Sequence, residues 1–143
     1  ECHAYFFGAL VLGMGLSKNG GDVERVLMHT SDVPAPYLQA LAASGWCCHP
    51  VEYISGVSKG LFHNWRTSRF VDVFTKLRVL QLTSYDKVLL LDLDLLIRPP
   101  QVEALRLDRL FDLQPPAAMK RGTPVPAHGE LLSYSAIWSH PTR

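Results

Sequence analysis

The sequence predicts an α/β protein built on a doubly wound, mostly parallel sheet. Segments with strand and helix patterns alternate along the chain, which is the order that such a sheet requires. Residues 88–97 are aliphatic except at Asp92 and Asp94, as in a parallel strand that helices cover on both faces. With 143 residues, of which 48% are hydrophobic, the chain is long enough for one domain with a real core and too short for two.

The first predicted element is an apolar helix over residues 5–17, closed by the glycines that follow residue 19. Its apolar residues run nearly all round, so we expect it to be buried on every side, with Gly8 and Gly13 allowing close packing. The later elements are a strand, a helix, a strand, a loop, a helix and the acidic strand, over residues 25–29, 34–44, 46–54, 55–69, 70–82 and 88–97.

The end of the chain follows a different pattern. Residues 114–143 are rich in Pro and Gly and show no period, so they predict an irregular tail beyond a recognisable core at about 5–113. The chain begins at Glu1 and ends without a closing element, which suggests one truncated domain. No apolar run reaches the roughly 20 residues that cross a bilayer, so no transmembrane segment is predicted. The cytoplasm and the Golgi lumen both remain open as compartments.

Charge and cysteine content exclude some classes of protein. The 14 basic and 13 acidic side chains give a net charge of +1, which argues against a broad surface for nucleic acid. Three cysteines, Cys2, Cys47 and Cys48, are too few for a disulfide framework and are expected to be reduced and buried. A zinc site at Cys47, Cys48 and His49 is the alternative, although the spacing matches no usual ligand pattern.

Asp92 and Asp94 are the main candidates for chemistry. Side chains two residues apart in a strand share a face, so the two carboxylates would lie together in an apolar wall. That arrangement is costly unless a cation, a proton or several hydrogen-bond donors compensate the charge. Oxygen ligands from one short segment suit Mg²⁺ or Mn²⁺ bound jointly with a substrate diphosphate. The simpler alternative is that the aspartates form ion pairs with Lys87, Arg98 or Lys76.

Two other enzyme patterns are weaker. Residues 56–60 read Gly-x-Ser-x-Gly, the nucleophile elbow of hydrolases with Ser58 as nucleophile, but no clear helix follows the serine. Asp-x-Asp on a strand also begins the motif of haloacid-dehalogenase-like phosphatases, and Leu96 occupies the position where that motif needs Thr or Val. Lys76 lies on an apolar helix face, where it would either extend into solvent or reach phosphates held by a metal.

The order of several segments resembles the glycogenin-like retaining glycosyltransferases of family 8. The first helix is similar to that family's first helix, and the central block and its closing segment follow in the family's order. The segments are YFFGALVLG at 5–13, FTKL at 74–77, LTSYDKV at 82–88, LDLDLLI at 91–97 and LFD at 110–112. Leu93 departs from the small residue usual between the aspartates, and 98–109 is longer than the family's link.

The resemblance implies a fold, a reaction and a site. The fold would be the nucleotide-sugar-binding α/β domain called GT-A, here an incomplete N-terminal fragment. Asp92 and Asp94 would hold Mn²⁺ (or Mg²⁺) on the diphosphate of a UDP-sugar donor. Tyr5 would contact the uracil side, Lys76 would bind the nucleotide-sugar, and the Leu93 backbone would lie near the ribose. The chain would then be a metal-dependent hexosyltransferase that retains configuration, with its acceptor and catalytic residue unassigned.

The same resemblance sets limits on this fragment. The family's first strand, its Asn-x-Gly segment and its His-x-x-Gly-x-x-Lys motif are not found in the sequence, so the fragment is expected to be inactive and its aspartates to lack metal. Two other functions stay open: a non-catalytic nucleotide-sugar-binding domain of the same fold, and a serine hydrolase that uses Ser58.

Overall fold

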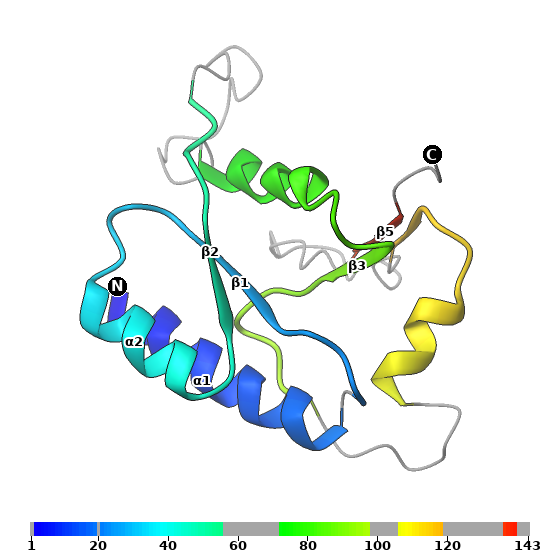
Figure 1. Cartoon of the computed structure of the whole chain (residues 1–143), viewed down its shortest axis with the longest axis horizontal. Coiled ribbons are helices and arrows are strands. Elements are labelled where there is room, and N and C mark those ends of the chain that lie inside the picture. Colours follow the sequence, from blue (N-terminus) through cyan, green and yellow to red (C-terminus); the bar gives the residue numbers. More distant parts are fainter. Residues whose placement is uncertain (1, 20, 56–71, 98–105, 119–135, 140–143) are drawn as a thin grey trace, which may run out of the picture.

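The computed structural model describes residues 2–19, 21–55, 72–97, 106–118 and 136–139 (Figure 1). Helices and strands alternate through most of these residues, which confirms the α/β prediction. The elements are α1 (Cys2–Asn19), β1 (Val26–His29), α2 (Ala35–Ala43), β2 (Cys47–Pro50), the 3₁₀ helix η3 (Asp72–Gln81), β3 (Lys87–Leu90), the 3₁₀ helix η5 (Leu107–Asp112), β4 (Ala117–Ala118) and β5 (Ala136–Ser139). The predicted loop at 55–69 lies, beyond Ser55, outside the described residues.

The described strands form two small sheets. β1 and β2 pair in parallel, with Val26 opposite Cys47, as the alternation predicts for strands joined by a helix. β3 instead pairs antiparallel with β5, and β4 pairs antiparallel with the other edge of β5. The prediction of one mostly parallel sheet is therefore correct only for β1 and β2. The tail expected to be irregular supplies β4 and β5, because a short strand can be specified by its partner rather than by its own period.

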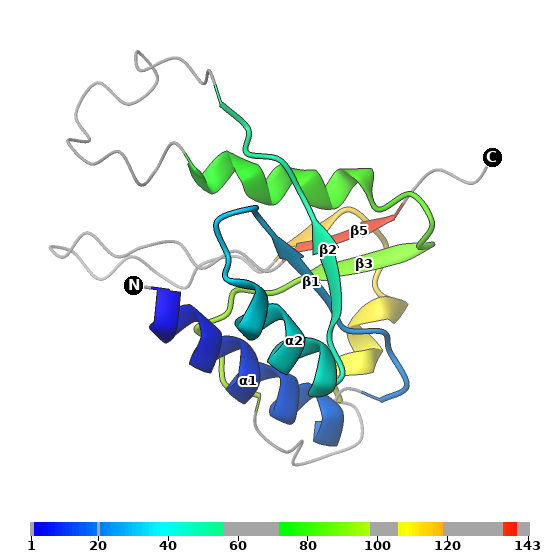
Figure 2. The same ribbon diagram turned by 60° about the vertical axis from the view of Figure 1, so that its left-hand side comes forward.

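The helices lie on both sides of the strands. In Figures 1 and 2, α1 and α2 lie together on one side of β1 and β2, and η3 lies on the other. Two side-chain bonds tie η3 to the segment after β2: the Thr75 hydroxyl accepts from the Ile54 amide at 3.2 Å, and Arg78 Nε donates to the Glu52 carbonyl at 3.0 Å. The helix predicted over 70–82 is thus present as η3.

Helix α1 packs one face on the core. The buried cluster combines this face with one residue each from β1, α2 and the start of β2: Ala9, Leu12, Leu16, Leu27, Leu41 and Trp46. Its opposite face is exposed, with Phe7 61% and Met14 61% accessible, so the expectation of burial on every side was wrong. Although its sequence is apolar nearly all round, only one face of this helix packs on the core.

Two glycines have structural roles: Gly13 lets Trp46 approach α1 closely, and Gly45 ends α2. Gly13 lies against the indole of Trp46, where a β-carbon would come within 2.6 Å of Nε1. This close approach lets the same Nε1 donate to the Ala9 carbonyl at 3.1 Å. Gly45 follows α2 with φ of 94°, a left-handed conformation that favours glycine and ends the helix.

Candidate nucleotide site

The acidic segment is a turn that follows a strand. β3 ends at Leu90, and Leu93 and Asp94 form a turn in which the Leu95 amide donates to the Asp92 carbonyl at 3.4 Å. The prediction of a strand over 88–97, with both carboxylates on one strand face, was therefore wrong. Asp is disfavoured in strands and common in turns, because its side chain bonds nearby backbone groups. The two aspartates still lie directly beyond the carboxyl end of β3.

The two carboxylates differ in environment. Asp92 is held by an ion pair with Lys76, whose Nζ bonds Asp92 Oδ1 across the space between η3 and the turn. The Asp92 side chain is 14% exposed and the Lys76 side chain 45%. Asp94 is exposed. One of the three ion pairs considered as the simpler alternative is thus present, and Asp94 remains accessible to a ligand from solvent.

Helix α1 packs closely against this turn at Gly8. A β-carbon at Gly8 would lie 2.8 Å from the Leu93 carbonyl oxygen and 3.5 Å from its carbonyl carbon. The glycine predicted to allow close packing therefore does so, and its partner is the backbone between the two aspartates. The Leu93 side chain, at the same time, packs against the core cluster.

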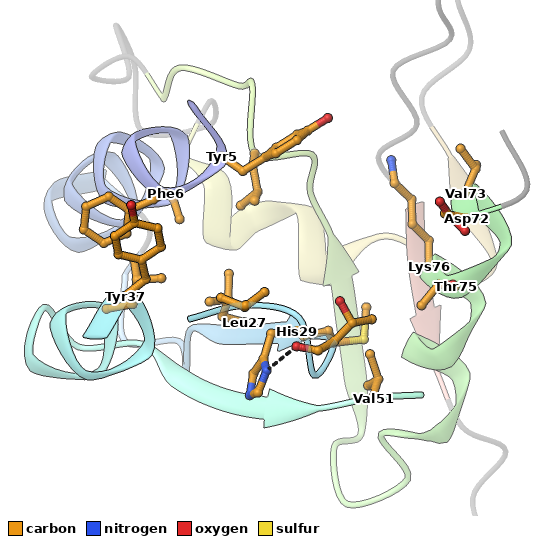
Figure 3. A pocket seen from close by; sticks show the side chains of 16 residues that line it. Tyr5, Phe6, Leu27, His29, Tyr37, Val51, Asp72, Val73, Thr75 and Lys76 are labelled. Atoms are coloured by element: carbon orange, nitrogen blue, oxygen red, sulfur yellow. Dashed lines mark hydrogen bonds between the residues drawn. The ribbon is translucent and has the colours of Figure 1, made fainter. Parts of the chain in front are cut away.

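A cavity of about 380 Å³ opens beside the turn, and the residues predicted to contact the nucleotide line it. Tyr5, Lys76 and Leu93 all line it, although they are far apart in the sequence. Figure 3 shows Tyr5 and Phe6 reaching in from α1 and Thr75 and Lys76 from η3. The remaining lining residues come from α1, β1, α2, η3 and the segments that follow β1 and β2: Ala9, Leu27, Met28, His29, Thr30, Val33, Tyr37, Leu41, Val51, Asp72 and Val73.

The position of the cavity matches the rule for open α/β sheets. His29 is the last residue of β1, and Val51 follows the last residue of β2, so the cavity lies at the carboxyl ends of both parallel strands. Ligands of doubly wound proteins bind at that edge. Its size falls within the range of small-molecule pockets, and its lining is mostly apolar with a few polar groups, as in such pockets generally.

Polar groups at the rim were not foreseen from the sequence. Thr30 lines the cavity and donates to Asp32, and the Tyr53 hydroxyl donates to the same carboxylate oxygen at 3.2 Å. The Thr30 hydrogen bond holds the pKa of Asp32 below its ordinary value, so the carboxylate stays charged. Asp72 also lines the cavity, one helical turn before Lys76. The spacing of Asp72 from Lys76 could have predicted that Asp72 lies near the site. No pattern in the sequence predicted that Thr30 and Tyr53 lie close together.

Other candidate sites fare differently. Cys47 and Cys48 are free thiols, as predicted, but Cys47 is exposed and Cys48 only half-buried, so the expectation that both are buried was wrong. Within the described ranges, no three His, Cys, Asp or Glu side chains gather to hold a metal, which leaves the zinc alternative without support. Ser58, the nucleophile of the hydrolase alternative, lies outside the described residues.

The two aspartates suit one kind of metal. Mg²⁺ and Mn²⁺ take oxygen ligands, and Mg²⁺ in particular binds through one or two carboxylates together with substrate phosphates and water. Asp92 and Asp94 supply that donor set from one turn, and the exposure of Asp94 leaves room for the other ligands. The donor chemistry therefore fits a metal shared with a diphosphate, and it does not fit a closed structural site.

Comparison with known proteins gives related sequences. An uncharacterised protein of Acanthamoeba polyphaga mimivirus is 39% identical over 95% of this chain and 45% of its own length. UDP-glucuronate:xylan alpha-glucuronosyltransferases 1 and 2 of Arabidopsis thaliana are 28% and 29% identical over 68% and 66% of this chain. The chain spans less than half of the viral protein and about one seventh of the plant proteins. No protein-family model matches the chain.

Among the described helices, none combines the length and the apolar character that a membrane span requires.

Proposed function

Because the chain is a distant homologue of the plant xylan glucuronosyltransferases, which are glycogenin-like glycosyltransferases of family 8, we propose that it forms the donor-binding part of a metal-dependent glycosyltransferase with a GT-A fold. The donor is a UDP-linked hexose or the corresponding uronic acid, and the sugar is transferred with retention of configuration. The observation that carries this proposal is the convergence of Tyr5, Lys76 and Leu93 on one cavity beside the acidic turn.

Three residues that line the cavity suit different parts of the donor. Tyr5 is 65% exposed at the amino-terminal end of α1, so its ring is available to stack on a flat apolar group such as uracil. The Leu93 backbone, whose carbonyl packs against Gly8, is fixed at the edge of the cavity, where the proposal places the ribose. Lys76 brings a positive charge to the same wall, where it suits a phosphate.

Asp92 and Asp94 hold the metal in this proposal. When bound, the metal would supply Lewis-acid chemistry at the diphosphate, which would make UDP a better leaving group. The residues of the chain contribute by placement: the carboxylates orient the diphosphate, and the Lys76 ammonium neutralises part of the charge that develops on it. The acceptor is left open, since no described group is placed to select one.

The proposal is tested by titrating the protein with UDP in the presence of Mn²⁺. Asp92→Asn and Asp94→Asn are each expected to weaken UDP binding by at least about tenfold, because a charged metal ligand becomes neutral. Asp86→Asn is the matched control, because this exposed residue precedes the opposite end of β3. Unchanged UDP affinity in both Asp92 and Asp94 variants would show that the site is misassigned.

A second measurement separates an enzyme from a binding domain. UDP-glucose and UDP-glucuronate are offered with Mn²⁺, and the release of UDP is followed. A transferase domain that is complete enough for chemistry hydrolyses the donor slowly at a metal-dependent rate. A non-catalytic domain of the same fold binds the donor with the same dependence on Asp92 and releases no UDP.

A further inference from the structure

Lys76 and a metal ion would both bind the carboxylate of Asp92. Lys76 Nζ occupies Oδ1 of Asp92, and Asp92 is one of the two carboxylates proposed as metal ligands. The Asp92 side chain is mostly shielded, at 14% exposure, so a nearby cation offsets the cost of taking its charge out of water. The lysine supplies that cation whenever the metal does not.

The two cations cannot share Asp92 without a penalty. An ammonium group and a divalent ion bound to the same carboxylate lie within a few ångströms of each other and repel. Lys76 is the one that can move, because its side chain is 45% exposed and unbranched. It also lines the cavity, so the displaced ammonium remains beside any phosphate bound there.

We infer that Lys76 competes with the metal for Asp92, and that UDP resolves the competition by accepting the released ammonium on its diphosphate. This inference rests on the proposed function of the same site. Metal alone must break the ion pair and leave Lys76 beside a second cation, so it binds weakly. UDP provides the lysine with a new partner, so metal and UDP bind cooperatively. By linkage each ligand raises the affinity of the other by the same factor.

The test is the affinity of the full chain for Mn²⁺, measured by the electron paramagnetic resonance of free Mn²⁺ with and without UDP. Lys76→Met removes the charge and keeps the length of the side chain. Without UDP it is expected to bind Mn²⁺ about two- to fivefold more tightly than the wild type, which is the scale of a partly exposed ion pair. The factor by which UDP tightens Mn²⁺ binding falls correspondingly.

Two further variants control for charge and fold. Lys76→Arg keeps a cation opposite Asp92 and is expected to retain weak Mn²⁺ binding without UDP. Lys18→Met makes the same change in net charge in the last turn of α1, and is expected to match the wild type. Thermal unfolding of each variant establishes that the folded protein is being compared.

The outcomes separate the inference from the proposed function. Equal Mn²⁺ affinity of the wild type and Lys76→Met without UDP overturns the competition, even if UDP and Mn²⁺ still bind together in a way that depends on Asp92. A wild type that binds neither UDP nor Mn²⁺, alone or together, overturns the proposed function and the inference with it. Tighter Mn²⁺ binding by Lys76→Met and weak binding by Lys76→Arg support both.

Discussion

Replacing Gly8 by alanine tests whether α1 positions the acidic turn. The added β-carbon would lie 2.8 Å from the Leu93 carbonyl oxygen, whereas ordinary contact begins at 3.4 Å, so the helix and the turn must separate by about 0.6 Å. Overpacking of this kind costs about 1–3 kcal/mol, and the better helix propensity of alanine returns about 1 kcal/mol. The free energy of unfolding should therefore fall by only about 0–2 kcal/mol.

Gly8→Ala should also weaken ligand binding at the site. Binding sites need their groups within about 0.5 Å of the productive geometry, so a shift of this size in the turn should weaken UDP binding in Mn²⁺ by about tenfold. Calorimetric titration measures this affinity, and urea unfolding measures the stability. The control is Gly13→Ala, in which the new β-carbon meets the Trp46 indole at 2.6 Å instead of the turn.

Gly13→Ala should lower stability at least as much as Gly8→Ala and change UDP affinity little in the protein that remains folded. The reasoning about the turn is refuted if Gly8→Ala binds UDP as tightly as the wild type. It is also refuted if the two alanine variants lose UDP affinity equally, because the loss would then follow the general packing of α1.

Three further predictions concern stability and reactivity. Trp46→Ala should lower the free energy of unfolding in urea by about 3–5 kcal/mol, since it empties a buried site, and Trp46→Phe should lose less because most of the ring remains. Arg106 donates from Nε and Nη2 to the two carboxylate oxygens of Asp108 and holds the pKa of that carboxyl below its ordinary 3.8. Stability present above about pH 4 should therefore decline as the pH falls through the lowered pKa, and Asp108→Asn should flatten that decline in unfolding curves measured at successive pH values. The Glu24 carboxyl beside Cys47 raises the pKa of the thiol, so Glu24→Gln should speed alkylation of Cys47 by iodoacetamide at pH 8, and an unchanged rate would contradict that cause.

Local patterns in the sequence predicted the elements better than their partners. The helix–strand alternation followed from side-chain periods, and the parallel pairing of β1 with β2 followed from the helix that connects them. The partner of β3 did not, because β5 comes from residues more than 40 positions later, and pairing at that distance leaves no local pattern. The end of β3 was also misplaced. Leu91, Leu93, Leu95 and Ile97 follow the strand and pack against the core, so the aliphatic run recorded burial rather than strand structure.

The site residues could be named from the sequence because their types and order carry the chemistry, whereas their coupling needed the structure. Resemblance to family 8 singled out Tyr5, Lys76 and the aspartates, and the cavity brings the first two together with Leu93. The sequence offered the ion pair of the aspartates with Lys76 only as one of three alternatives, and it gave no sign that Gly8 supports Leu93, because both contacts join segments distant in the chain. A residue type can be read from one position, but a contact depends on the whole fold.

Helix α1 therefore links stability to ligand binding. One face holds the core through Leu12, its amino-terminal end supplies Tyr5 to the cavity, and Gly8 supports the turn between the aspartates. A ligand that binds Tyr5 and the acidic turn together contacts two segments that separate when α1 leaves the core. Such a ligand binds the folded chain only, and at a hundred times its dissociation constant it stabilises the fold by about 2.7 kcal/mol. Because Gly8→Ala is expected to weaken ligand binding about tenfold, it should remove about half of this added stability at a fixed ligand concentration while leaving the unliganded chain folded.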